Sequence, residues 1–335
     1  MTVTELAQPM PLTIEDRGSP RRVTPGAIVV ALVNNMPDPA LEATEGQFAG
    51  LLAAAAGARE VRLRLVCLPE VPRAPETREG MAGRYFTVED TLAEPPDALI
   101  VTGLEPRAPS LEDEPYWSRM CQLLEWAQRH TASSVWSCLA AHLAAQALQG
   151  VRRHRLPEKR FGVFEHPQLA AHRLLRDVDS PLLTPHSRWN DLPVEPLRAA
   201  GFEILSASPH NGADLFVHAG RSLLIGFQGH PEYQDTTLLK EYRRDVGRFL
   251  RGELPAWPRV PQGYFCEDAL ASLAAFRERA EPRRDPALIG QFPTQMLVKA
   301  VHASWRPAAV AIYRNWLEVL AEMRGRHRAS ITVPV

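Results

Sequence analysis

Hydrophobic and polar positions fall into alternating blocks along this chain, and the blocks predict a sheet of mostly parallel strands. Residues 27–33 (AIVVALV) form a continuous apolar run, which is typical of a strand buried on both faces. Further runs of this kind cover residues 61–68, 97–103 and 133–138. Helical patterns separate the runs at residues 42–56, 116–129 and 139–149. Strands that alternate with helices of this length indicate βαβ units.

The pattern changes after Gly150. Short strand-like pieces follow at residues 161–164, 202–207, 214–217 and 223–227, and we expect them to complete the same sheet as an antiparallel extension. A helix is predicted at residues 236–250, and the tail from 268 to 323 is largely helical in pattern.

This order of elements predicts an α/β protein with three parts. Residues 1–25 read as a mobile N-terminal arm, residues 26–256 as the α/β domain, and residues 257–335 as a mainly helical extension packed on the same domain. The first residues lack the basic region and apolar core of a secretory signal. No apolar run approaches the roughly 20 residues that a membrane helix needs. We therefore expect a cytoplasmic protein that does not bind membranes.

Composition narrows the class of partner. Apolar residues make up 45% of the 335 residues and charged residues 23%, which fits a soluble globular protein. The formal net charge of −1 gives no global field that would attract nucleic acid, so small-molecule partners are expected. The four cysteines are Cys67, Cys121, Cys138 and Cys266. They show no CxxC or metal-ligand spacing, which predicts reduced thiols and no metal site.

One cysteine stands where a parallel sheet places its chemistry. In SSVWSCLAAH (residues 133–142), Cys138 lies between a predicted strand and a predicted helix. Ligands of open α/β sheets bind at the carboxyl ends of the strands. The N–H groups at the start of the helix could stabilise both a thiolate and an oxyanion. Taken alone, the pattern favours a buried inert cysteine over a nucleophile.

A second strand end carries a candidate base. In LIGFQGHPEY (residues 224–233), His230 and Glu232 follow an apolar strand and lie two residues apart. His230 could accept the thiol proton, and Glu232 could fix the tautomer of the ring. On its own, the segment favours an ordinary surface turn over a catalytic one. Together with Cys138, however, the two residues form a candidate Cys-His-Glu triad.

Several segments of the chain, in this order, resemble the homoserine O-succinyltransferase family. They are NNMPDPALEATEGQF (34–48), DALIVTG (97–103), EPYW (114–117), SSVWSCLAAHLAAQAL (133–148), EKRFGVFEH (158–166), PHSRWND (185–191), GHPEYQDTTLLKEYRRDV (229–246), ASWR (303–306) and NWL (315–317). The resemblance covers roughly residues 25–320. It implies a flavodoxin-like, class I glutamine amidotransferase-like fold, in which a mostly parallel sheet is flanked by helices.

The resemblance also implies an activity and a catalytic triad. Cys138 matches the nucleophile of the family, His230 its general base and Glu232 the orienting carboxylate. The implied reaction moves an acyl group from acyl-CoA to the hydroxyl of homoserine through an acyl-cysteine, a step of methionine biosynthesis. Acyl-CoA is a co-substrate here, and no cofactor or metal is implied. A homodimer is implied as well.

Further residues match substrate-site positions of the family. Lys159, Ser187 and Arg188 match positions near the substrate, and Arg244 matches the arginine expected to hold the carboxylate of the amino acid. Taken alone, Lys159 and Arg244 could equally be surface charges. Backbone N–H groups are needed for the tetrahedral oxyanions. The candidate donors are those of Asn35, Met36 and Leu139.

One position bears on the choice of acyl donor. In the loop after Gly103, the family has glycine or glutamate at a position that helps select acetyl or succinyl donors, and this chain has Arg107 there. An arginine can pair bidentately with the distal carboxylate of a succinyl group. Succinyl-CoA is therefore the predicted donor. An acetyl donor and a serine acceptor remain alternatives.

One departure from the family pattern and two other function classes stay open at this stage. The segment of residues 266–302 is longer than the usual connection of the family and includes an amphipathic run at 269–276. A glutaminase-type hydrolase would use the same fold and triad, although the usual GxCxG around its nucleophile is WSCLA here. A non-enzymatic binding module would leave Cys138 unreactive.

Overall fold

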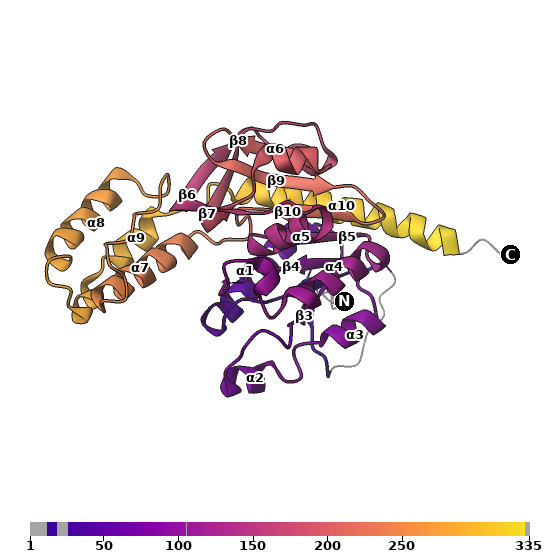
Figure 1. Cartoon of the computed structure of the whole chain (residues 1–335), viewed down its shortest axis with the longest axis horizontal. Coiled ribbons are helices and arrows are strands. Elements are labelled where there is room, and N and C mark those ends of the chain that lie inside the picture. The colour runs from indigo at the N-terminus through magenta and orange to yellow at the C-terminus, as the bar shows by residue number, and fades with distance from the viewer. Residues whose placement is uncertain (1–11, 19–25, 105, 332–335) are drawn as a thin grey trace, which may run out of the picture.

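The computed structural model describes residues 12–18, 26–104 and 106–331, and its centre is a sheet of eight strands among these residues (Figure 1). In spatial order the strands are β1 (Leu12–Glu15), β3 (Val61–Val66), β2 (Ile28–Val33), β4 (Ala98–Val101), β5 (Ser133–Ser137), β10 (Leu223–Phe227), β9 (Gly212–His218) and β8 (Glu203–Ser208). The pairs from β1 to β10 are parallel, and β9 pairs antiparallel with both β10 and β8. The predicted parallel sheet with an antiparallel extension is thus confirmed.

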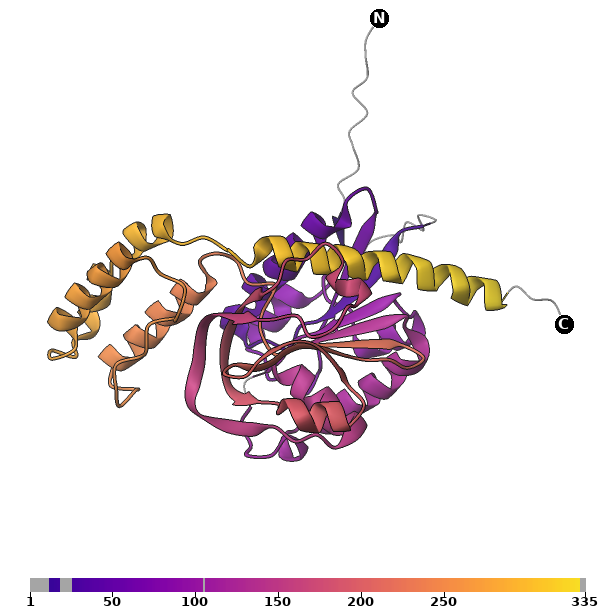
Figure 2. The ribbon, with the colours of Figure 1, turned by 90° about the horizontal axis from the view of Figure 1, so that it is seen from above.

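Helices cover both faces of the sheet. On one face lie α1 (Leu41–Ala56) and α10 (Arg306–Ile331), whose buried side chains share a core with β2 and β3. The long α10 crosses this face, as Figure 2 shows in yellow. The other face is covered by α3 (Val88–Ala93), α4 (Trp117–His130), α5 (Leu139–Gln149) and α6 (Val194–Ala199). Each face is apolar because every central strand presents buried residues on both sides.

One predicted strand lies outside the main sheet. Residues 161–164, expected to extend it, belong to β6 (His154–His166), which pairs antiparallel with β7 (Leu182–Asp191) in a separate two-stranded sheet. The strand β7 was not predicted, because its polar sequence LLTPHSRWND lacks an apolar run. Only a glycine fits at Gly162, where a Cβ would lie 2.2 Å from the carbonyl oxygen of Gln262. The two strands form an arm beside the carboxyl edge of the main sheet.

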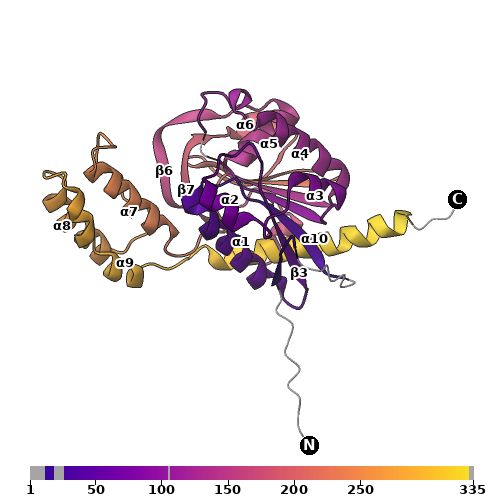
Figure 3. The same ribbon diagram turned by 90° about the horizontal axis from the view of Figure 1, so that it is seen from below.

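The chain beyond β10 divides into two parts. A helical lobe contains α7 (Thr237–Leu250), α8 (Glu267–Ala280) and α9 (Thr294–Ala300), and it projects from the body of the molecule (Figure 3). The lobe has its own core, which the aromatic side chains of Tyr242, Trp257 and Phe276 help to fill. Only α10 returns to the sheet. Of the expected extension, residues 257–335, α8 and α9 pack with α7 and α10 packs on the sheet, and the predicted domain boundaries stay a prediction.

The strand β1 lies within the segment that the sequence placed in a mobile arm. It pairs in parallel with β3, and Glu15 forms ion pairs with Arg64 at 2.7 Å and with Arg62 at 3.2 Å. Residues 1–11 and 19–25 of the expected arm lie outside the described residues. A four-residue strand with polar neighbours gives little periodicity, so the pattern of the sequence could not show it.

Short elements complete the structure. They are α2 (Pro75–Met81) and the 3-10 turns η1 (Asp38–Ala40), η2 (Leu111–Asp113), η3 (Arg173–Leu175) and η4 (Pro286–Gln291). None of the helices in the described part of the chain combines the length and hydropathy needed to traverse a bilayer.

Candidate active site

Two adjacent central strands end at the candidate triad. The strand β5 leads to Cys138, and β10 leads to the turn that carries His230. The parallel register sets Ser137 opposite Phe227, and the N–H of Cys138 donates to the carbonyl of Phe227 at 2.7 Å. The nucleophile and the base turn are therefore side by side, although 92 residues separate Cys138 from His230 along the chain.

The backbone at Cys138 is held in a conformation that side chains rarely adopt. Its φ is 53° and its ψ −116°, and it is the N-cap of α5. Strain of this kind persists only where the surroundings impose it, and it is frequent at functional sites. The cysteine is half-buried, so its sulfur is reachable while the helix start lies beneath it. The predicted strand, tight turn and helix are confirmed.

His230 and Glu232 form the predicted pair. The Nδ1 atom of His230 lies 2.8 Å from Oε1 of Glu232, which leaves Nε2 for the nucleophile side. The ring stacks on Tyr233 with centroids 4.3 Å apart, and the N–H of His230 donates to the carbonyl of Pro185 at 2.8 Å. The stacking therefore fixes the plane of the ring, and the hydrogen bond fixes the backbone of His230.

The charges around His230 favour its protonated form. Burial alone would lower the pKa of His230, but the carboxylate of Glu232 and then the sulfur of Cys138 outweigh burial and raise this pKa well above its ordinary value. The second oxygen of Glu232 is buried and has no hydrogen-bond partner among the described residues, so the imidazolium is its main compensation. The proton on His230 stabilises the fold fully below about pH 6.5, and this contribution is lost as the pH rises through the raised pKa.

Three of the predicted substrate-site residues lie together beside α7. The Nζ of Lys159 lies 3.4 Å from Asp245 and 3.7 Å from Glu241. The hydroxyl of Ser187 donates to Glu241 at 2.5 Å, and Nε of Arg244 donates to Asp245 at 2.9 Å. These side chains come from β6, β7 and α7, so the arm and the lobe meet here.

Sequence reasoning missed the carboxylates of this group. Glu241 and Asp245 lie four residues apart and therefore on one face of α7. Glu241 also accepts from the hydroxyl of Tyr233 at 2.7 Å, the same tyrosine that stacks on His230. The i, i+4 spacing of two acids around Arg244 in KEYRRD was the available signal. A cavity of about 300 Å³ opens beside Lys159, with Phe161 and Gln262 in its wall.

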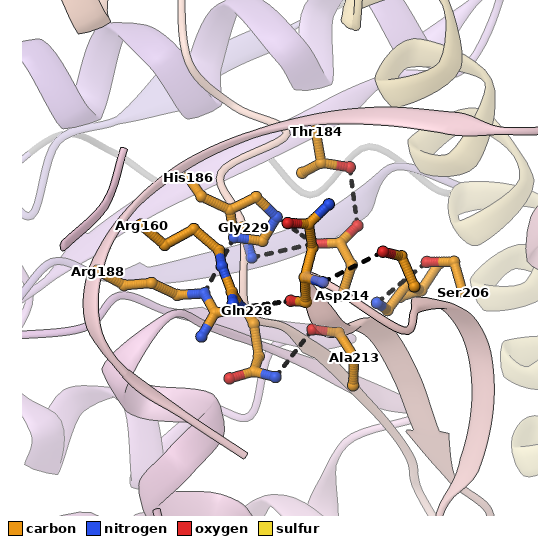
Figure 4. Close-up of polar contacts among 12 residues, drawn as sticks. Arg160, Thr184, His186, Arg188, Ser206, Ala213, Asp214, Gln228 and Gly229 are labelled. Carbon is orange, nitrogen blue, oxygen red and sulfur yellow. Dashed lines mark hydrogen bonds and ion pairs between the residues drawn. The ribbon is translucent and has the colours of Figure 1, made fainter. Parts of the chain in front are cut away.

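Arg188, predicted as a substrate contact, points elsewhere. It is buried, and its Nε donates to Nδ1 of His186 at 3.1 Å (Figure 4). Its terminal nitrogens donate to the carbonyls of Asn190 and Asn211 and to Asp191. With Nε and both terminal nitrogens engaged, the guanidinium supports the arm. The contacts of Arg188 among the described residues are therefore structural, and its predicted contact with the substrate stays a prediction.

The N–H groups of Asn35 and Met36 are not free to bind an oxyanion. The first donates to Oγ1 of Thr102 at 2.8 Å, and the second to the side chain of Asn34 at 3.2 Å. Arg73 fixes the same loop, because it donates to the carbonyls of Asn34 and Met36. Both residues thus shape the loop after β2, and the predicted donor role is not supported for either.

Leu139 keeps its predicted place. It is the first residue of α5, where backbone N–H groups lack partners within the helix. Gly103, just after β4, approaches it closely, since a Cβ at residue 103 would lie 2.9 Å from the Leu139 nitrogen. The absence of a side chain at Gly103 leaves space in front of this N–H group. The loop after β4, which carries Gly103, therefore lies beside the N–H of Leu139, where the sequence had predicted the loop after β2.

Arg107 lies in this same loop and is exposed. Its backbone N–H and that of Ala108 donate to one oxygen of the buried Glu114, at 2.6 and 2.8 Å. Nearby, Arg153 is half-buried, and its Nη1 has no hydrogen-bond partner in the described part of the chain. Burial lowers the pKa of Arg153, while Tyr116, Glu114 and Cys138 act in the opposite direction. Two guanidinium groups therefore border the loop.

Known proteins match this chain over nearly its whole length. A family model described as homoserine O-succinyltransferase matches residues 12–324. A homoserine O-succinyltransferase from Rhodopseudomonas palustris is 47% identical, over 91% of this chain and 91% of the relative. One from Methylorubrum extorquens is 41% identical, over 88% and 87%. A solved glutamine amidotransferase from Methylobacillus flagellatus has a TM-score of 0.50 at 18% identity, covering 88% of this chain and 95% of that one.

The carboxylate of Glu232 should set the titration of His230. In a Glu232→Gln variant we expect the imidazole to titrate at a lower pH than in the wild type, because the charge that raises its pKa is gone. We also expect kcat to fall by about 10² or more. NMR titration of the imidazole signals measures the shift, with the distant His172 as internal reference. An unchanged titration of His230 would contradict the assigned role.

Proposed function

The chain belongs to the homoserine O-succinyltransferase family, and from that membership we propose that it moves a succinyl group from succinyl-CoA to L-homoserine through a thioester on Cys138. The observation that carries this proposal is the placement of Cys138, His230 and Glu232 at the ends of two paired strands. The class I glutamine amidotransferase-like fold is consistent with it, since such folds host several acyl-transfer chemistries.

In the first half-reaction Cys138 attacks the thioester carbonyl. Because the raised pKa of His230 favours the imidazolium, the proton of the thiol already lies on Nε2 and the sulfur attacks as a thiolate. The carbonyl oxygen becomes an oxyanion that faces the N–H of Leu139. When the tetrahedral intermediate collapses, the bond to the CoA sulfur breaks and His230 returns the proton to that sulfur. A succinyl thioester remains on Cys138, and Glu232 keeps Nε2 directed at the reacting atoms throughout.

In the second half-reaction homoserine is the nucleophile. Its hydroxyl attacks the thioester carbonyl while His230 accepts the hydroxyl proton, and the same N–H group stabilises the new oxyanion. Collapse expels the sulfur of Cys138, which regains the proton from His230. The ester of homoserine is released. Every proton in the cycle moves through His230, so the proposed chemistry needs no cofactor.

The group beside α7 has the charges that homoserine requires. The amino acid carries a carboxylate and an ammonium group, and the group offers cations at Lys159 and Arg244 beside carboxylates at Glu241 and Asp245. Arg244 is 56% exposed at its side chain, so it can turn toward a ligand carboxylate. A homodimer and a cytoplasmic location belong to the same proposal and rest on the resemblance to the family.

Capture of the acyl-enzyme tests the central claim. We expect wild-type protein incubated with succinyl-CoA and no acceptor to gain the mass of one succinyl group on the peptide that contains Cys138. Cys138→Ala should gain none and lose transfer to homoserine, because no other group replaces the nucleophile. Cys266→Ala, which changes an exposed cysteine, is the matched control and should behave as wild type.

The same assay separates the competing functions. Ammonia release from glutamine would favour a glutaminase, and faster turnover with acetyl-CoA or with serine would replace the proposed donor or acceptor. Full transfer activity in Cys138→Ala would refute the covalent mechanism.

The space at Gly103 should be required for the oxyanion. Gly103→Ala places a methyl group close to the Leu139 N–H, and we expect kcat to fall about 10²- to 10³-fold, the usual cost of losing one such donor. Single-turnover acylation measured by quenched mass spectrometry checks this. Gly46→Ala is a suitable control, because a Cβ there meets no atom within 4 Å and lies in a helix. Wild-type acylation by a folded Gly103→Ala protein would contradict the assignment.

Donor choice should depend on the guanidinium groups that border the loop after β4. In Arg107→Gln we expect kcat/KM for succinyl-CoA to fall about 10- to 100-fold, the equivalent of one hydrogen bond to a charged group, with acetyl-CoA unaffected. Arg153→Gln is the comparison variant. If the Arg107→Gln variant still prefers succinyl-CoA over acetyl-CoA and the Arg153→Gln variant does not, the partner of the succinyl carboxylate is Arg153 instead.

A further inference from the structure

A buried polar cluster lies directly behind the turn that carries His230. Its members are His166, His186 and Asp214, with exposed fractions of 0%, 0% and 1%. One atom of each lies within 4.8 Å of the others, a spacing that could hold a metal ion. Figure 4 shows His186 and Asp214 pointing toward each other, with Gly229 beside them.

The hydrogen bond at Nδ1 of His186 argues against a metal ion. Arg188 donates to Nδ1, so the proton of the neutral imidazole is on Nε2, and Nε2 faces Oδ1 of Asp214 at 3.4 Å. A metal at Nε2 would need the opposite tautomer, which Arg188 opposes. Burial and then the positive charge of Arg188 lower the pKa of His186 well below its ordinary value, so the ring is neutral. Arg160 adds to the positive field.

The contacts of Asp214 point to the base turn instead. Its Oδ1 accepts from the N–H of Gly229 at 3.1 Å, and its Oδ2 accepts from the hydroxyl of Thr184 at 2.8 Å. Its backbone carbonyl accepts from the N–H of Gln228 at 2.8 Å. One residue of β9 thus binds both residues that precede His230.

The fit around Gly229 is close. A Cβ at this residue would lie 2.4 Å from Thr184 and 2.7 Å from Oδ1 of Asp214. On the far side of the turn, the N–H of His230 is bound by Pro185 of β7. Asp214 of β9 thus binds Gly229, and Pro185 of β7 binds the next residue, His230. Without the side chain of Asp214, the turn could rotate about the remaining hydrogen bond to Pro185.

We propose that Asp214 is a positioning residue which, with Thr184 and the neutral His186, fixes the turn at Gly229 and thereby directs His230 at the sulfur of Cys138. The inference rests on the proposed function, because it assigns Asp214 a task in that reaction. Asp214 itself touches no reacting atom. Its effect is geometric, and a misplacement of about 1 Å at a catalytic group can lower a rate by about 10².

Three variants test the proposal. Asp214→Ala removes both acceptors, and we expect kcat to fall about 10²-fold with KM for both substrates unchanged. Asp214→Asn keeps an oxygen for Gly229 and can donate to Thr184, so it should recover most of the lost rate. Ser206→Ala is the matched control, since it removes another buried acceptor, which binds the N–H of Leu215 at 3.2 Å, without touching the turn. It should lower Tm and leave kcat unchanged.

A second readout does not depend on succinyl transfer. The pH dependence of Cys138 alkylation by iodoacetamide reports how closely His230 and the sulfur are coupled, and we expect Asp214→Ala to change the shape of this pH profile while Ser206→Ala does not.

Unchanged kcat and an unchanged alkylation profile in folded Asp214→Ala would overturn the positioning role. Stoichiometric zinc bound by the wild type and lost in His166→Ala would overturn it in favour of a metal site. Activity in Cys138→Ala would instead refute only the proposed function.

Discussion

The pairing of β5 with β10 is the constraint on which the site depends. These strands are neighbours in space and are separated by the arm, β8 and β9 in sequence. Their register places the hydrogen bond from Cys138 to Phe227 at the last rung of the ladder. A slip of one residue would turn every side chain to the opposite face and separate the nucleophile from the base. The buried residues on both faces of the two strands make such a slip costly.

From this rung outward, buried carboxylates organise the site. Glu232 orients His230 and raises its pKa, Asp214 binds the turn before it, and Glu241 links Tyr233 to Ser187 and Lys159. A carboxylate suits this work because two oxygens can accept from two elements at once, and low dielectric strengthens each contact. Asp214 and Glu241 thus join separate strands and helices, and these acceptors would leave costly unpaired groups if one partner were removed.

Much of the fold and part of the site could be predicted from the sequence. Continuous apolar runs located the central strands, and strand ends located Cys138 and His230, because both signals are local. The family resemblance added Lys159, Ser187 and Arg244, which the structure brings together. Contacts across the fold could not be predicted. Nothing in the local sequence shows that Arg188 is hydrogen-bonded within the arm. Nor does it show that the N–H groups of Asn35 and Met36 already have acceptors. Likewise, β7 shows no apolar run because several of its buried side chains, such as His186 and Arg188, are polar.

The C-terminal segment supports the chemistry from two sides. On the sheet, Trp316 of α10 donates to the hydroxyl of Ser133 at 3.0 Å, and Tyr313 stacks on Phe227, so the helix contacts both catalytic strands. Trp305 donates to the carbonyl of Tyr233 at 3.0 Å, next to the stacked His230. In the lobe, α8 and α9 bury one side of α7 while its other side presents Glu241 and Asp245 to Lys159. Without α8 and α9, the apolar side of α7 would be exposed and the acidic side would lose its orientation. The extension is thus a structural requirement of the substrate group.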